Sequence, residues 1–235
     1  MIIAIDGKYG VGKTTTAKCL ARRLGYNYLS TGAIFRAIAL KVIEVKIEKE
    51  DKEAIIKIAK EINIEVKQID KETKIFIDGK DLTEKAYTHN EKIDSVTSYL
   101  GRNIPEVTEI ITKLQREIAK SGNFIFEGRD MTSRVFPNAD WKFYIQAEMM
   151  KRAERMYKIL PDEEKETYPT IEDYSKLDHF HKEYPGAEDA IVYDNTYSPT
   201  PEQDAIVLEY YITHPKEILG NIGKIKDKKE PIKNN

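Results

Sequence analysis

The chain of 235 residues is short of several residue types, and each shortage excludes a class of protein. Its only cysteine is Cys19, so no disulfide can form within the chain, and we expect a reducing, cytoplasmic setting. Its 38 lysines and arginines are outnumbered by 40 aspartates and glutamates, which argues against nucleic acid as a partner. No apolar run approaches the ~20 residues that a membrane helix needs, and residues 1–6 lack the basic region of a signal peptide.

The chain does contain a balance of hydrophobic and charged residues, 40% and 33%, that suits a folded domain. Short β-like runs alternate with helix-like runs, a pattern typical of an α/β fold with a parallel sheet. A helix is expected from about Thr14 to Leu24, because apolar residues share one face and Gly25 can end it. Five strands, which together predict a doubly wound sheet, are expected at residues 2–5, 26–29, 123–127, 141–146 and 190–193.

Three segments depart from this alternation. Residues 63–80 alternate apolar and polar side chains and end in the turn-like Asp78–Gly79, which predicts a small antiparallel β insertion. Residues 160–187 are polar, show little apolar periodicity and are predicted to form a mobile flap. The lysine-rich residues after His214 are predicted to be a solvated tail.

The clearest motif is GKYGVGKT at residues 7–14, which matches the phosphate-binding pattern G-x-x-x-x-G-K-[ST]. A buried strand precedes it and an amphipathic helix follows it, as the motif requires. Its glycines allow a tight turn, and the backbone N–H groups at the helix N-terminus attract phosphate oxygens. Lys13 is predicted to reach the β- and γ-phosphates of a nucleotide, and the Thr14 hydroxyl to bind Mg²⁺.

Arginine is scarce, with nine residues against 29 lysines, so its positions are informative about phosphate binding. Arg36 and Arg129 each closely follow the end of an expected strand, where ligands bind in open α/β sheets. With the phosphate loop they predict a crevice for an acceptor that is itself a phosphate ester. Arg152 and Arg155 share a helix face, and Glu127 ends a strand as an acid that could hold a Mg²⁺-bound water.

Taken together, these motifs resemble the bacterial cytidylate (CMP) kinase family of nucleoside monophosphate kinases. The matching stretches are IAIDGKYGVGKTTTAK (3–18), LSTGAIFRAIAL (29–40), IDGKDLTE (77–84), IPEVTEIITKLQREIA (104–119), FEGRDMTSRVFPNAD (126–140), KRAERM (151–156) and AEDAIVYDNT (187–196). The resemblance implies a P-loop kinase that transfers the γ-phosphoryl group of ATP to CMP or dCMP with Mg²⁺, acting as a monomer.

The resemblance also implies a division of the chain and a set of site residues. A kinase domain would span 1–213, with a core (1–40, 104–159 and 188–213), a nucleoside-monophosphate-binding part (about 41–103) and a lid (about 160–187), followed by a basic tail (214–235). ATP would be bound by Gly7, Lys8, Tyr9, Gly10, Val11, Gly12, Lys13, Thr14 and Thr15. The acceptor would be held by Thr31, Arg36, Arg129 and Asp130. The catalytic groups would be Lys13, Arg129, Arg152 and Arg155.

The chain departs from the usual family pattern at three places. Ser30 replaces a usual aspartate, Thr108 replaces a usual arginine that helps to read cytosine, and residues 174–186 lack the usual arginines. Two alternatives therefore stay open: a kinase of the same build that acts on another small molecule, or a nucleotide-binding regulatory protein with little catalysis. CMP or dCMP as the acceptor therefore follows from the resemblance, and not from the residues at these three places.

Overall fold

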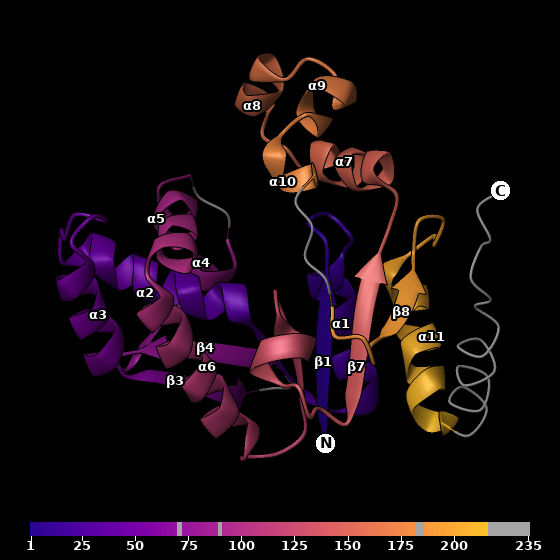
Figure 1. Cartoon of the computed structure of the whole chain (residues 1–235), viewed down its shortest axis with the longest axis horizontal. Helices are drawn as coiled ribbons and strands as arrows, with labels where there is room; N and C mark the ends of the chain where they lie inside the picture. The colour runs from indigo at the N-terminus through magenta and orange to yellow at the C-terminus, as the bar shows by residue number, and fades with distance from the viewer. Residues whose placement is uncertain (70–71, 89–90, 182–185, 216–235) are drawn as a thin grey trace, which may run out of the picture.

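The computed structural model describes residues 1–69, 72–88, 91–181 and 186–215. Five parallel strands form the central sheet in the order β2–β6–β1–β7–β8 (Figure 1). Their bounds are β1 (Ile2–Gly7), β2 (Asn27–Ser30), β6 (Phe124–Glu127), β7 (Trp141–Gln146) and β8 (Ile191–Asp194). The five predicted strands and the α/β fold class are confirmed, with strand ends displaced by no more than about two residues.

Helices surround this sheet, and the one predicted after the phosphate loop is confirmed as α1, which ends at Gly25 in a left-handed conformation. The helices are α1 (Lys13–Leu24), α2 (Thr31–Glu44), α3 (Lys52–Glu61), α4 (Thr83–Tyr87), α5 (Glu91–Asn103), α6 (Pro105–Ala119), α7 (Met149–Lys158), α8 (Asp162–Thr167), α9 (Ile171–Ser175), α10 (Asp178–His181) and α11 (Pro201–Thr213), with a π-helical turn η1 (Met131–Val135). Among the described residues, no helix combines the length and apolar character needed to cross a membrane.

The central strand β1 is buried on both faces, which explains its continuous apolar sequence. Ala4 points to one face, where it joins Leu29, Phe126 and the buried sides of α2 and α6. Ile3 and Ile5 point to the other face, where they pack with residues of α1 and α11. The sheet therefore separates two apolar cores, and the carboxyl ends of its strands carry the candidate site residues.

The β insertion predicted at residues 63–80 is confirmed as an antiparallel sheet of β3 (Ile64–Ile69), β4 (Glu72–Ile77) and β5 (Lys80–Asp81). Asp78 and Gly79 both have positive φ angles, 48° and 80°, as a two-residue hairpin turn of the I′ type requires. Ile75 and Ile77 lie in the same core as Ala4 of the main sheet. The insertion therefore shares a core with the rest of the domain.

Residues 160–187 contain three short helices, α8 to α10, which the sequence analysis did not predict. Figure 1 shows them grouped with α7 beyond the carboxyl end of β7. Their apolar contacts come from residues spaced three apart, Tyr168, Ile171, Tyr174, Leu177 and Phe180, a helical spacing that the sequence analysis missed. The predicted tail lies, from residue 216 onward, outside the described residues.

We expect Ile75→Ala to lower the free energy of unfolding by about 3 kcal/mol, because it opens a cavity in the shared core. Ile69→Ala, in the same small sheet but 42% exposed, should cost less than about 1 kcal/mol. Urea denaturation followed by circular dichroism measures both. Equal losses in the two variants would show that the insertion does not share the core.

Candidate functional site

The loop between β1 and α1 approaches its neighbours so closely that only glycine fits at two positions. A Cβ on Gly7 would lie 2.2 Å from the carbonyl oxygen of Ile145, and one on Gly10 would lie 2.9 Å from that of Arg152. Gly10 and Gly12 also adopt left-handed backbone conformations, and Gly12 caps α1. The tight turn leaves N–H groups at the start of α1 to face an anion.

Lys13 folds back over this loop and lies among several charged groups. Its Nζ donates to the carbonyl oxygens of Gly7 and Lys8 at 2.8 and 2.9 Å. Burial is the main reason that the pKa of Lys13 falls to about 8. The negative charge of Glu127 raises that pKa, whereas the positive charges of Arg129 and Arg152 lower it. Both arginines therefore act electrostatically on the lysine of the phosphate loop.

Glu127 connects the phosphate loop to β2 and supplies a carboxylate beside the predicted Mg²⁺ ligand. Its Oε1 accepts hydrogen bonds from the Thr14 hydroxyl and from the Tyr28 hydroxyl, each at 3.1 Å. Burial and the charge of Glu127 hold the pKa of Tyr28 well above its usual value, so this phenol stays a donor. The hydroxyl and carboxylate oxygens of Thr14 and Glu127 are hard donors that fit a divalent cation. Sequence reasoning missed Tyr28.

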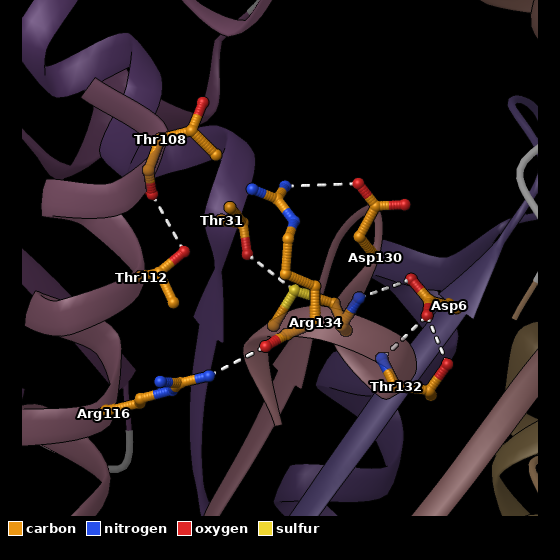
Figure 2. Close-up of polar contacts among 9 residues, drawn as sticks. Asp6, Thr31, Thr108, Thr112, Arg116, Asp130, Thr132 and Arg134 are labelled. Carbon is orange, nitrogen blue, oxygen red and sulfur yellow. Dashed lines mark hydrogen bonds and ion pairs between the residues drawn. The ribbon is translucent and has the colours of Figure 1, made fainter. Parts of the chain in front are cut away.

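The turn that carries Arg129 and Asp130 is held by Asp6 at the end of β1 (Figure 2). The buried carboxylate of Asp6 accepts bonds from the N–H groups of Met131 and Thr132, at 2.9 and 2.8 Å, and from the Thr132 hydroxyl at 2.5 Å. Asp130 has a φ of 57°, which turns the chain sharply into η1. Asp6 and Thr132 thereby position Arg129 and Asp130, and the only sequence signal was an acid at the end of a buried strand.

Thr31 lies at the meeting point of α2, α6 and this turn. Its hydroxyl accepts from Nε2 of Gln115 at 2.8 Å and donates to Sδ of Met131 at 3.0 Å. A Cβ on Gly128 would lie 2.7 Å from that hydroxyl, so the GRD segment needs glycine there. Thr108, labelled in Figure 2, lies two turns before Gln115 on α6 and is also buried.

Arg36 projects from α2 and pairs with Asp94 of α5, with Nε and Oδ1 3.0 Å apart. A Cβ on Gly32 would lie 3.4 Å from Nη1 of Arg36, so the guanidinium lies against the N-terminal turn of α2. The pKa of Tyr9, in the phosphate loop, is raised mainly by burial and by Tyr174, with a further contribution from the charge of Asp94. The charge of Asp94 therefore acts on a residue of the phosphate loop.

Arg152 and Arg155 extend from α7 to the other side of the phosphate loop. Arg152 donates to the carbonyl oxygens of Ala147 and Tyr9, each at 3.1 Å, and to that of Phe180 at 3.0 Å. Its side chain is buried.

Arg155 donates to the Asn195 carbonyl and side-chain oxygens at 2.6 and 3.1 Å, and Asn195 in turn donates to the Val11 carbonyl at 2.8 Å. In this structure both arginines fix the main chain of the loop.

A family model for cytidylate kinase matches residues 3–208. The chain belongs to the cytidylate kinase family. A cytidylate kinase from Caldicellulosiruptor bescii is 36% identical over 216 residues, which cover 89% of this chain and 94% of that protein. A second, from Caldicellulosiruptor saccharolyticus, is 34% identical and covers 93% of this chain and 97% of its own length. One from Caldanaerobacter subterraneus is 42% identical over 158 residues, 67% of either chain.

The family assignment confirms the resemblance drawn from the motifs, and the fold that it implied is present. The structure brings the phosphate loop, Glu127 and Arg129 together at the carboxyl ends of β1 and β6. Arg36 and Thr31 lie on α2, which follows the neighbouring strand β2. The individual roles of these residues remain predictions.

We expect ATP binding to weaken and to take up a proton as the pH rises through about 8, the pKa of Lys13 in the free protein. Bound phosphates favour the charged amine, so its pKa is higher in the complex and a proton must enter on binding. Calorimetric titration in buffers of different ionisation heat should give uptake of about 0.9 proton at pH 9 and about 0.1 at pH 7. Equal uptake at both values would contradict the lowered pKa.

Proposed function

We propose that the protein transfers the γ-phosphoryl group of ATP to the phosphate of CMP or dCMP and releases ADP with CDP or dCDP. The observation that carries the proposal is that, in a chain of this family, Glu127 bonds to Thr14 of the phosphate loop, and Asp6 at the end of β1 holds the turn that carries Arg129. Lys13 would bind the phosphates of the donor, and Arg129 would bind the phosphate of the acceptor.

ATP binding would use the main chain of residues 7–15 and Lys13. The amine would exchange its contacts with the carbonyls of Gly7 and Lys8 for the β- and γ-phosphates. We propose Mg²⁺ as the divalent cation, held by Thr14 with Glu127 beside it, where it would neutralise charge on the donor phosphates. Tyr28 would keep the Glu127 carboxylate aimed at Thr14.

The acceptor would bind on the opposite side, with its phosphate on Arg36 and Arg129 and its nucleoside near Thr31 and Asp130. Arg36 would exchange the Asp94 carboxylate for the acceptor phosphate. Two arginines there would reduce the repulsion between two anions, which must come into line for transfer. An acceptor phosphate is already ionised at neutral pH, so an oxygen of it can attack the γ-phosphorus without a general base.

During transfer, the bond from the γ-phosphorus to the bridging oxygen of ADP breaks as the bond to the acceptor oxygen forms. Lys13, Arg129 and the charge of Arg152 would stabilise the negative charge on the transferred group. Arg155 would contribute by holding the Val11 carbonyl and Asn195, and so the loop that aligns the donor. Arg152 would thus act directly on the transferred group, whereas Arg155 would act through the loop.

The two alternatives raised from the sequence are not favoured by the family assignment, and the open question is how strongly the base is selected. Thr108 and Gln115 are neutral and buried on α6, so neither supplies a cation for recognition of the base. We expect a preference for CMP and dCMP over UMP and AMP. The buried thiol of Cys19 suits the reducing cytoplasm, and we propose that the protein acts there as a monomer.

Substrate selection can be tested with a coupled assay of ADP release on CMP, dCMP, UMP and AMP. We expect turnover that is highest with CMP or dCMP and at least about 100-fold lower in Lys13→Ala, because the donor phosphates lose their main charge partner. Lack of turnover with all four acceptors would reject the proposal. Highest turnover with AMP would favour another acceptor class.

Acceptor binding can be tested with Arg36→Met, which keeps an unbranched stem but removes the guanidinium. We expect the KM for CMP to rise about 30-fold or more while the KM for ATP changes less than about threefold. Arg23→Met is the matched control, because Arg23 pairs with Glu209 on the far side of α1 and should leave both constants unchanged. A larger change in the KM for ATP than for CMP would place Arg36 outside the acceptor site.

A further inference from the structure

The phosphate loop has an aromatic contact with the α8–α10 segment (residues 162–181) that the kinase reaction does not by itself require. The ring of Tyr9 meets the ring of Phe180 edge-on, with centroids 5.3 Å apart and planes at 74°. Phe180 meets Tyr174 in the same way at 5.3 Å. Tyr174 also acts on Tyr9, whose pKa is raised first by burial and then by Tyr174. The loop is therefore one wall of an aromatic cluster.

The side chain of Arg152 reinforces this contact by bonding to main-chain carbonyls on both sides of it. One of its terminal nitrogens donates to the carbonyl of Tyr9 and the other to the carbonyl of Phe180. The guanidinium also lies 6.0 Å from the centre of the Phe180 ring. Because Arg152 is only 3% exposed, its bonds are shielded from water and depend on both partners staying in place.

The α8–α10 segment has few positively charged side chains that could bind the phosphates of a nucleotide. No arginine occurs anywhere after Arg155 in the sequence. Its described lysines Lys165 and Lys176 pair with Asp162 and Asp173 of the same segment. Its largest buried side chains are instead the aromatic rings of Tyr174 and Phe180, with Tyr9 packed against them.

We propose that Tyr9 is a positioning residue that anchors the α8–α10 segment to the phosphate loop through Phe180 and Tyr174. The anchor is aromatic, so the position of the segment is set by the protein before ATP binds and is insensitive to salt. The proposal that Tyr9 holds the segment rests only on the contacts above. The effect expected on catalysis rests in addition on the proposed kinase function. Loss of the anchor should lower kcat more than it raises the KM for ATP.

Hydrogen exchange of the nucleotide-free protein tests the anchor without any turnover. In Tyr9→Ala we expect the exchange rate of residues 162–181 to rise about tenfold, because the loss of an aromatic contact favours local opening of the segment by about that factor. The exchange rate of α11 should not change. Tyr9→Phe keeps the ring and should retain most of the protection. Tyr210→Ala, which removes a 44% exposed tyrosine on α11, should leave residues 162–181 unchanged.

A second variant, Phe180→Ala, approaches the same contact from the other side. In the double variant with Tyr9→Ala, the increase in exchange of residues 162–181 should be smaller than the sum of the two single effects on a logarithmic scale, because both variants remove the Tyr9–Phe180 contact. Protection in the unsubstituted protein should change less than about twofold in 1 M NaCl. Unchanged exchange in Tyr9→Ala, an increase spread over the whole chain, additive effects or loss of protection in salt would each overturn the proposal. None of these exchange results depends on whether CMP is the acceptor.

Discussion

The buried carboxylate of Asp6 joins the two halves of the candidate site. It lies one residue before the phosphate loop, and it accepts three hydrogen bonds from the turn that carries Arg129. A carboxylate in an apolar interior is costly unless donors compensate it, and burial does raise the pKa of Asp6. The donors of Met131 and Thr132 offset that cost only when η1 keeps this position. The fold thereby constrains where the turn of Arg129 lies relative to the phosphate loop.

The same connection extends beyond the turn. The Thr132 hydroxyl, which donates to Asp6, also accepts from the N–H of Ala187 at 3.0 Å. Ala187 lies where the chain has passed the α8–α10 segment and approaches β8. One short polar chain therefore links the end of β1, the GRD turn and the approach to β8. Arg155 and Asn195 make a comparable link between the phosphate loop and the residues that follow β8.

What could be predicted from the sequence depended on local signals. The buried strand, the glycines and the lysine of residues 2–13 stand in one continuous stretch, so the phosphate loop could be found without tertiary information. The hairpin of the β insertion was equally local, since the positive φ angles of Asp78 and Gly79 follow from their residue types. Such features need no knowledge of how distant segments pack.

The features that were missed depend on the pairing of distant strands and on the placement of one helix. Tyr28 meets Glu127 because β2 and β6 pair with Ser30 beside Glu127, across almost 100 residues of sequence. Arg152 and Arg155 stood out as a shared helix face, but their contacts with loop carbonyls depend on where α7 packs against Gly10. The helical period shows that these two side chains share one face of α7, but it does not show which segment that face contacts.

The pairing of β2 with β6 also gives a physical meaning to one departure from the family pattern. Ser30 stands where an aspartate is usual, and its strand partner is Glu127. An aspartate there would place a second buried carboxylate beside the first, and like charges in a buried site raise each other's pKa. With serine, Glu127 is the carboxylate that contacts Thr14, and Tyr28 steadies it by a hydrogen bond. Serine at this position therefore spares Glu127 the repulsion of a second carboxylate on the paired strand.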